Sequence, residues 1–413
     1  MALIRPFPGL RPVPGRAGDV VAPPYDVLST SEAREQVAGR PWSFLHISRP
    51  EVDLPVGTDP YAPEVYAKAA ENLDKMRRAA VLAQDPASCF YVYRLAMGEH
   101  VQTGLVAAAS VEAYDCDRIK KHEFTRPVKE DDRVRQIEAL NAQTGPVFLV
   151  YPSHAEVDEI LAGLAQGAPE VDVRAWDGVR HQLWVVSERP ILERLTFLFD
   201  AMDCLYVADG HHRSAAASRV AGQRRLANPN HTGSESYNFF LSVIFPHRQM
   251  RILDYNRVIR DLHGQDVDTF LERVALRCEV APSDGPVRPA QPAEFGMYLP
   301  GQWYRLRLDR GRIPWDDPVS RLDVSLLANE LIEPLLGIVD QRRDERIDFV
   351  GGIRGLGALQ QRVDSGNWAV AFSLFPTAMQ DLMSVADAGE VMPPKSTWFE
   401  PKLADGLVSH LLD

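Results

Sequence analysis

The sequence predicts an α/β fold of the mixed α+β kind, in which strands and helices alternate along most of the chain. Short runs rich in Val, Ile, Leu, Phe and Tyr recur and are typical of buried strands. Between them lie segments whose apolar residues are spaced three and four apart, as on one face of a helix. With 413 residues, 45% of them hydrophobic and 25% charged, the chain is long enough for about two or three domains of ordinary globular composition.

The first half of the chain alternates between the two patterns. Ser29 or Thr30 has the side chain to cap a helix that begins near Ser31. Residues 63–82 show the spacing of an amphipathic helix. The elements expected after it are strands at 89–96 and 103–114 as an antiparallel pair, a helix at 129–144, a strand at 147–151, a helix at 156–166, a strand at 180–187, a helix at 190–200 and a strand at 204–208.

The second half continues the alternation. An Ala-rich helix is expected from Ser214 and a buried strand at 237–245, while the Pro-rich composition of 281–293 predicts a long loop or soft boundary. Beyond it we expect strands at 297–300 and 303–309, a helix at 319–336, a strand at 347–351, a helix at 356–364, a strand at 368–375 and a helix opened by Pro376 and Thr377.

Charge and cysteine content exclude several classes of protein. The 45 Lys and Arg residues against 57 Asp and Glu give a formal net charge of −12, which opposes binding to nucleic acid or to an anionic membrane. The four cysteines form no CxxC pair, so neither a sequential zinc cluster nor a dense disulfide framework is expected. The first residues turn to Pro and Gly before any signal-peptide core, and no apolar stretch is long enough to span a membrane. We therefore expect a cytoplasmic protein.

The densest group of chemically active residues is DGHHR, Asp209 to Arg213, at the change from an apolar strand to an Ala-rich helix. A helix N-terminus presents unpaired N–H groups to an anion, and Gly210 permits close approach of a phosphate. His and Arg side chains supply positive charge, and Asp209 can hold a divalent metal that bridges phosphate oxygens. The alternative is that Asp209 caps the helix and the histidines satisfy local hydrogen bonds.

A second charged group lies in the segment KKHEFTR, residues 120–126. It is not an HExxH zinc motif, because no His follows His122 at the fourth position. Glu123 can act as a general base on a hydroxyl group if the fold brings this loop to DGHHR. The alternative is a solvated loop before a salt-bridged helix.

A third group is MPPKSTWFEPK, which contains Lys395, Ser396, Thr397 and Lys402. It is not a Walker A motif, because Pro394 stands where the second Gly is required. Lysines on a Pro-stiffened loop can close over an anionic substrate, and the alternative is a plain surface loop.

Three further features have a structural explanation at the level of the residues. The glycines between 351 and 357 have the spacing GGxxGxG rather than GxGxxG, which favours tight turns over a dinucleotide site. The segment PPYDV is a stiff loop that can present Tyr25 or Asp26 to a pocket, and His46 is expected to be a core or edge residue, with Arg49 nearby as a conceivable anion contact.

Several of these segments occur together: RPFPGLRP with APPYDV, FLHISRPE, HEFT with DDR downstream, YVADGHHR and MPPKSTWFEPK. In this combination the chain resembles, over nearly its whole length, the bacterial and archaeal domain-of-unknown-function family ten-fifteen. DGHHR also resembles the phosphate-binding box of the ParB and sulfiredoxin superfamily, which includes kinases that phosphorylate free L-serine.

The resemblance implies a ParB/sulfiredoxin-like catalytic domain over 1–255 and a C-terminal α/β region, 256–413, that closes the site with its PPKST loop. In this scheme Glu123 is the base, His212 is catalytic and Asp209 assists through Mg²⁺. The donor phosphate is held by Gly210, His211, Arg213, Lys395, Ser396 and Thr397, with a further contribution from Lys402, and the acceptor is held by Tyr25, Asp26, His122 and Thr125.

We therefore expect a small-molecule kinase that transfers a phosphoryl group from ATP, ADP or pyrophosphate to the hydroxyl of free L-serine or a similar metabolite. One alternative is a nucleotide-binding regulatory protein of ParB-like type, but the sequence has no helix-turn-helix with a basic recognition face. Another is a phosphate-ester or nucleotide hydrolase in which Glu123 activates water. The oligomeric state is not predicted.

Overall fold

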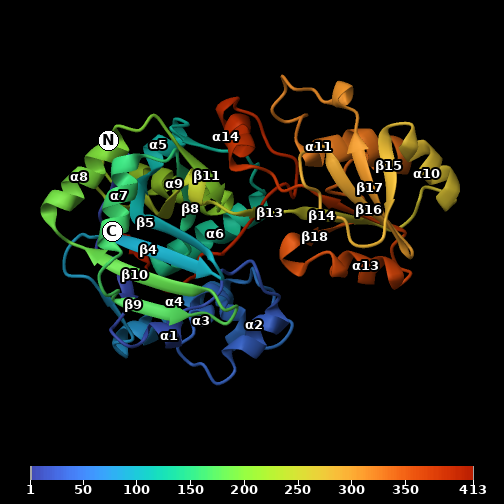
Figure 1. Ribbon diagram of the computed structural model, residues 1–413. Helices are drawn as coiled ribbons and strands as arrows, with labels where there is room; N and C mark the ends of the chain where they lie inside the picture. Colours follow the sequence, from blue (N-terminus) through green and yellow to red (C-terminus); the bar gives the residue numbers. More distant parts are fainter. Residues whose placement is uncertain (1, 413) are drawn as a thin grey trace. The chain divides into compact units, whose positions relative to one another are not determined.

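The computed structural model describes residues 2–412, which form two compact units (Figure 1). Unit 1 runs to Met250 and also contains the segment from Pro401 onward, whereas unit 2 is Arg251–Glu400. Both combine a central sheet with packed helices, so the predicted mixed α/β class is confirmed. The division of the chain into domains at residue 255 stays a prediction.

The main sheet of unit 1 has the strand order β6-β11-β8-β12-β5-β4-β10-β9, with β1 added beside β5. The predicted antiparallel pair is confirmed as β4 and β5, but its second strand ends at Ser110 because the following residues form helix α5, Val111–Asp115. The strands are β1 (Ile4–Arg5), β4 (Phe90–Met97), β5 (His100–Ser110), β6 (Ile119–Lys120), β8 (Val147–Tyr151), β9 (Val171–Arg174), β10 (Arg180–Val186), β11 (Leu205–Asp209) and β12 (Phe239–Pro246).

Helices cover this sheet through an apolar core. Helix α9, His211–Ala227, packs Ala217 and Ala221 against the sheet strands and turns Ala216 and Val220 toward helix α6, Pro127–Leu140. Small alanine side chains on both faces let α9 lie between the sheet and α6. Helices α7 (Ala155–Leu164) and α8 (Arg189–Asp200) pack on the same core.

The N-terminal part of unit 1 forms a smaller helical cluster around Phe44, Leu45 and Leu73. The predicted cap is confirmed: the Ser29 hydroxyl accepts the N–H of Glu32, and the Glu32 carboxylate accepts the N–H of Ser29. Its elements are β2 (Leu10–Pro12), α1 (Ala17–Val20), α2 (Thr30–Val37), α3 (Leu45–Ser48), α4 (Pro63–Arg78) and β3 (Leu82–Gln84).

The segment from Pro401 closes unit 1 through backbone pairing. Strand β21, His410–Leu411, pairs with β7, Ala142–Gln143, and isolated bridges join Leu10 to Ser409 and Ala22 to Asp405. These contacts connect residues far apart in sequence and place Asp405 beside the PPYDV loop.

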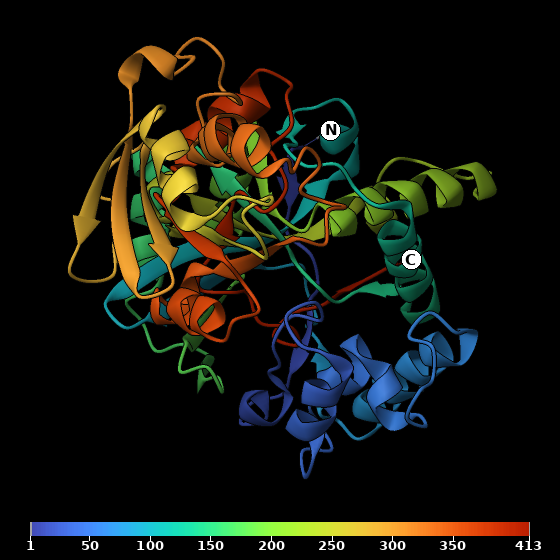
Figure 2. The ribbon, with the colours of Figure 1, turned by 90° about the vertical axis from the view of Figure 1, so that its right-hand side faces the viewer.

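Unit 2 is built on a sheet with the order β15-β17-β16-β19-β14-β18, and Figures 1 and 2 show it from two sides. Alternate side chains serve two cores: Phe372 faces α10 and α11, while Ala371 faces α13. The elements are β13 (Ile252–Leu253), β14 (Tyr255–Ile259), α10 (Val267–Ala275), β15 (Cys278–Ser283), β16 (Glu294–Leu299), β17 (Gln302–Leu308), α11 (Asp323–Leu327), α12 (Glu333–Leu336), β18 (Ile347–Gly351), α13 (Gly357–Asp364), β19 (Val370–Leu374), α14 (Met379–Asp387) and β20 (Trp398–Phe399).

Two sequence predictions for unit 2 need correction, and one strand was not predicted. The expected loop at 281–293 begins with the end of β15, because residues 281–283 pair with β17. The helix expected at 319–336 starts at Asp323 and changes to a π-helix over Ala328–Ile332 before α12. Strand β14 was missed, because Arg257 interrupts its apolar pattern.

Over residues 2–412, no helix combines the length and the apolar character needed to cross a membrane.

Candidate active site

The candidate site is centred on the turn between β11 and α9. Gly210 has φ +99°, and a Cβ atom on it would lie 2.9 Å from Nε of Arg213, so this position requires glycine. Asp209 turns back and accepts the Gly210 N–H at 2.9 Å through Oδ1. The helix itself begins at His211, three residues earlier than predicted, and this places both histidines and Arg213 in its first turn.

Arg213 is the buried positive charge of the turn. Its Nη1 donates to the carbonyl of Pro146, and its Nη2 lies 3.4 Å from Oδ2 of Asp209. Burial alone disfavours the guanidinium charge, but the acidic neighbours, Asp209 first and then Asp26, raise the pKa of Arg213 above its usual value. The charge is therefore held permanently beneath the helix N-terminus.

His211 and His122 form a buried pair. Their rings meet edge to face with centroids 4.5 Å apart, and Nε2 of His211 accepts the backbone N–H of His122 at 3.5 Å. Burial lowers the pKa of His122 to about 4 and that of His211 well below its usual value, so both are neutral at pH 7. Nδ1 of His122 is buried and has no hydrogen-bond partner in the described chain.

The loop that carries Glu123 is tied to this turn from two sides. Oε2 of Glu123 lies 3.6 Å from Nδ1 of His211, and Nε2 of His212 accepts the backbone N–H of Arg126 at 3.0 Å. Because Nε2 of His211 is the acceptor for His122, its hydrogen belongs on Nδ1, facing Glu123. The Glu123 side chain is 59% exposed and is accessible to a ligand. The structure thus brings the DGHHR turn and the loop of residues 120–126 together.

Asp209 is held ionised at the edge of the site. Burial favours its neutral form, but the positive charges of Lys402 and Arg213 lower the pKa of Asp209 to about 2. Lys402 belongs to the segment of unit 1 after Pro401, so the chain brings this lysine to the turn from almost two hundred residues away. The Asp209 side chain remains 40% exposed.

The PPYDV loop also reaches the site. Asp26 is exposed, and its negative charge favours the protonated forms of His212 and Arg213, although burial lowers the pKa of His212 overall. The Tyr25 ring instead packs under the guanidinium of Arg133 at 3.9 Å, and burial raises the pKa of Tyr25 to about 12. Asp26 is therefore positioned to contact a ligand, whereas the ring of Tyr25 serves packing.

Thr125 has a local structural partner. Its hydroxyl donates to Oε2 of Glu130 at 2.8 Å, in the first turn of α6. Glu130 in turn accepts from Arg219 of α9 at 2.8 Å, which fastens α6 to α9. This bond occupies the hydroxyl proton of Thr125 and leaves its oxygen as the group available to an acceptor molecule.

Sequence reasoning missed Asp405. It is 2% exposed and lines a small internal cavity of about 30 Å³, together with Tyr25, Arg133, Gly145 and Arg213. Burial raises the pKa of Asp405 to about 7, although Arg213 acts in the opposite direction. No local motif marks this residue, because Asp405 is a single acid in the run LADGL and its role depends on long-range pairing.

Lys395, Ser396 and Thr397 lie in unit 2. The Ser396 hydroxyl donates to the carbonyl of Pro393 at 2.6 Å, so it is used inside the loop. The Lys395 ammonium lies 5.5 Å from the centre of the Tyr255 ring.

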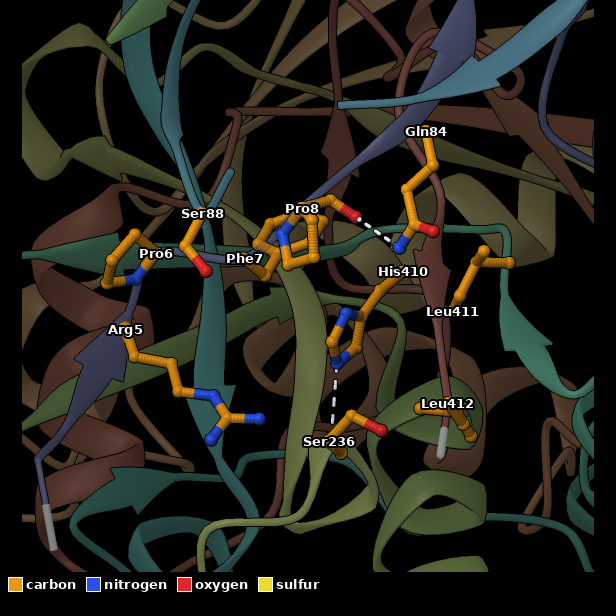
Figure 3. Close-up of a pocket in the computed structure, with 10 residues that line it drawn as sticks. All are labelled: Arg5, Pro6, Phe7, Pro8, Gln84, Ser88, Ser236, His410, Leu411 and Leu412. Atoms are coloured by element: carbon orange, nitrogen blue, oxygen red, sulfur yellow. Dashed lines mark hydrogen bonds between the residues drawn. The ribbon is translucent and has the colours of Figure 1, made fainter. Parts of the chain in front are cut away.

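A second, larger cavity of about 590 Å³ lies elsewhere in unit 1 (Figure 3). In it Gln84 donates to the carbonyl of Pro8, and Nε2 of His410 lies 3.2 Å from the carbonyl of Ser236. Neither the DGHHR turn nor the 120–126 loop contributes to its lining. The lining residues are Arg5, Pro6, Phe7, Pro8, Gln84, Ser88, Ser236, His410, Leu411 and Leu412.

A metal ion at the site would need help from a ligand. In the described part of the chain, no group of three or more His, Cys, Asp or Glu side chains is arranged to hold a metal ion. Asp209 by itself offers an ionised and partly exposed carboxylate. One carboxylate together with phosphate oxygens and water is a donor set that suits Mg²⁺.

Comparison with solved structures gives several distant similarities. The chain is similar to a conserved hypothetical protein from Pyrococcus furiosus, with 14% identity and a TM-score of 0.34 over 73% of this chain and 94% of that one. It is similar to a free serine kinase in complex with AMP, with 14% identity and a TM-score of 0.33 over 71% and 86% of the two chains. It is also similar to truncated SbnI from Staphylococcus aureus, with 12% identity and a TM-score of 0.35 over 73% and 86%.

Sequence comparison identifies the family. No curated protein sequence matches the chain significantly. A family model described as "Protein of unknown function (DUF1015)" matches residues 4–325, which is most of the chain and includes the DGHHR turn and the Glu123 loop. The resemblance recognised in the sequence is therefore confirmed, and the chain belongs to the DUF1015 family.

Proposed function

We propose that this protein is a small-molecule kinase that transfers a phosphoryl group from ATP, ADP or pyrophosphate to the hydroxyl of free L-serine or a similar metabolite. The observation that carries the proposal is the placement of Glu123, with Oε2 3.6 Å from Nδ1 of His211, at the N-terminus of α9. A carboxylate is thereby set beside a site suited to a phosphate group.

The helix N-terminus supplies the donors for the phosphate. The N–H groups of His211 and His212 have no acceptor in the described chain, whereas Gly210 donates to Asp209. Together with the buried charge of Arg213, they offer an oxyanion two N–H donors and a positive potential. The neutral side chains of His122 and His211 beside them add no competing anion.

The negative charge of Asp209 favours binding of a cation together with the phosphate. An ionised carboxylate beside a phosphate repels it, and the pKa of about 2 means that Asp209 stays charged throughout the physiological range. Mg²⁺ held by Asp209 and the phosphate oxygens would neutralise part of the phosphate charge. Lys402 adds a second positive charge near the same carboxylate.

Glu123 acts as the general base in this scheme. As the acceptor oxygen forms its bond to phosphorus and the bond from phosphorus to the leaving oxygen breaks, the hydroxyl proton passes to the Glu123 carboxylate. The Glu123 side chain is 59% exposed, so an acceptor hydroxyl can reach its carboxylate from solvent. Asp26, on the opposite loop, is placed to bind a positively charged group of the acceptor, such as an amine.

Phosphorus NMR tests the proposal directly. The full chain is incubated with Mg²⁺ and L-serine and, in separate tubes, with ATP, ADP or pyrophosphate. We expect a new phosphomonoester resonance that requires both serine and one of the donors. Decay of the donor at the same rate without serine would show that the protein hydrolyses the donor and is not a kinase. The absence of any reaction would reject serine as the acceptor.

A further inference from the structure

The side chain of Arg49 forms its hydrogen bonds inside unit 1. Arg49 follows α3, and its side chain is 16% exposed. Its Nε donates to Oε1 of Glu51 at 2.6 Å, and its Nη2 donates to the hydroxyl of Thr30 at 2.8 Å. Its Nη1 donates to the carbonyls of Tyr25 and Leu28, at 2.8 and 2.6 Å. These bonds occupy four of the five N–H donors of a guanidinium, so Arg49 is not available as the anion contact that the sequence suggested.

The two carbonyls that Nη1 binds bracket Asp26 in the PPYDV loop. One carbonyl belongs to the residue before Asp26, and the other belongs to the second residue after it. Within the same turn, the N–H of Val27 donates to the carbonyl of Pro24 at 3.3 Å. Hydrogen bonds from a charged, planar guanidinium are stronger and more directional than those between neutral groups. Arg49 therefore fixes the main chain on both sides of Asp26.

The carboxylate of Asp26 has no anchor of its own. It is exposed, and it forms no hydrogen bond and no salt bridge with any group of residues 2–412. Its negative charge nevertheless acts on both His212 and Arg213. The main chain that Arg49 holds is therefore what keeps this charge beside the DGHHR turn.

We propose that Arg49 is the positioning residue of Asp26, and that it thereby determines the preference of the site for an acceptor that carries a positively charged amine. Arg49 does not touch the acceptor, and it holds the PPYDV loop so that the Asp26 carboxylate faces the DGHHR turn. This inference rests on the proposed function, because an amine of the acceptor is the group that Asp26 would bind. An acceptor of the same shape without the amine gains nothing from Asp26 and is therefore insensitive to Arg49.

The placement of Asp26 can be measured without any substrate. The reporter is His212, whose titration in the full chain is followed by NMR and is assigned by its loss in His212→Ala. The charged groups that act on the His212 ring are Asp26 from the PPYDV loop and, from α6 and the residue before it, Arg126, Lys129 and Glu130.

Arg49→Met should lower the pKa of His212, because the negative charge that favours the protonated ring is no longer held beside it. The loss of the Arg49 charge by itself would act in the opposite direction, so a fall reports the movement of Asp26. Asp26→Asn should lower the pKa of His212 in the same way, and the double variant should titrate like Asp26→Asn alone. An unchanged pKa of His212 in Arg49→Met overturns the positioning role.

Arg34→Met is the matched control. Arg34 also donates to main-chain carbonyls of the helical cluster, but these belong to Glu51, Val52 and Leu54. The control should leave the titration of His212 unchanged, and an equal fall there would overturn the specific role of Arg49. If Arg49→Met fails to fold, Arg49→Lys takes its place and should cause a smaller fall, because lysine keeps the charge but lacks the planar fork that binds both carbonyls.

Steady-state kinetics then test the preference for an amine. The acceptors are L-serine and 3-hydroxypropionate, which has the same hydroxyl and carboxylate but no amine. Arg49→Met should raise KM for serine by about tenfold or more, and it should leave kcat, the donor affinity and KM for 3-hydroxypropionate unchanged. An equal rise of KM for both acceptors overturns the role in selectivity. If the unmodified protein phosphorylates neither acceptor, the kinase proposal fails, and the titration of His212 still decides whether Arg49 positions Asp26.

Discussion

The Nε2 atom of His212 accepts the backbone N–H of Arg126 at 3.0 Å, and this bond fastens the loop that carries Glu123 to the first turn of α9. The histidine is half-buried, and burial lowers its pKa, so the neutral ring that can accept this hydrogen bond is the form present at neutral pH. The position of the proposed base therefore depends on a side chain from the DGHHR turn.

Replacing His212 with alanine should release the loop without unfolding unit 1. We expect kcat/KM to fall by about 10²-fold or more, while the melting temperature changes by only a few degrees. Hydrogen exchange of the Arg126 amide should accelerate in the variant, and this can be followed by mass spectrometry. The exposed His154→Ala serves as the control. Unfolding of His212→Ala, or unchanged exchange at Arg126, would contradict this role.

Glu123→Gln removes the proton acceptor and keeps the shape of the side chain. We expect kcat to fall by about 10²- to 10⁴-fold with the donor affinity unchanged, because the base acts on the acceptor hydroxyl. Calorimetric titration of the donor and steady-state turnover measure the two quantities. Glu138→Gln, an exposed change on α6, should affect neither. Weaker donor binding with intact turnover would remove Glu123 from the role of base.

Gly210→Ala should destabilise the protein. A Cβ atom there would lie 2.9 Å from the Arg213 guanidinium. The position also has φ +99°, which alanine rarely adopts. We expect a loss of about 1–3 kcal/mol in the free energy of unfolding, measured with urea. Gly222→Ala on the same helix is the matched control, because its Cβ meets open space. That variant should gain about 0.5–1 kcal/mol.

Asp405 should make the free energy of unfolding fall as the pH rises from about 4 to 7. The carboxyl keeps its proton up to about pH 7 in the folded chain but loses it near pH 3.8 when exposed, so the folded state binds more protons between these values. Its contribution is thus fully favourable at acid pH and is lost between about pH 4 and 7, by up to about 4 kcal/mol. Asp405→Asn should flatten this part of the stability profile. An identical profile in the variant would contradict the buried, protonated acid.

Local patterns predicted the elements that build the site. The bounds of β8 and β18 match the sequence prediction, and Ser29 caps α2 as expected. The strand, turn and helix around DGHHR were also predicted, because apolar periodicity and a glycine at a turn are local properties. Glu123 was chosen from its residue type alone, and its approach to His211 follows from the tertiary fold.

The features that escaped prediction depend on contacts between distant segments. Asp405 enters the site through a bridge to Ala22. Lys402, from the same segment, was among the predicted contributors to the site, but its effect on Asp209 was not predicted. Strand β14 was not predicted, because the charged Arg257 at its centre interrupts the apolar pattern expected of a buried strand. The partners of Arg257 are loop carbonyls 137 and 138 residues away, which no local pattern indicates.

The segment from Pro401 returns to unit 1 after all of unit 2 has been made, and this has a consequence for folding on the ribosome. The pairing of β21 with β7 and the bridges of Asp405 and Ser409 cannot form while that segment is still unsynthesised. Nascent unit 1 therefore exposes the backbone edge of β7 and lacks Lys402 and Asp405. The DGHHR turn acquires its full set of charged neighbours only after residues 401–412 have emerged, so a partly synthesised chain lacks the complete candidate site.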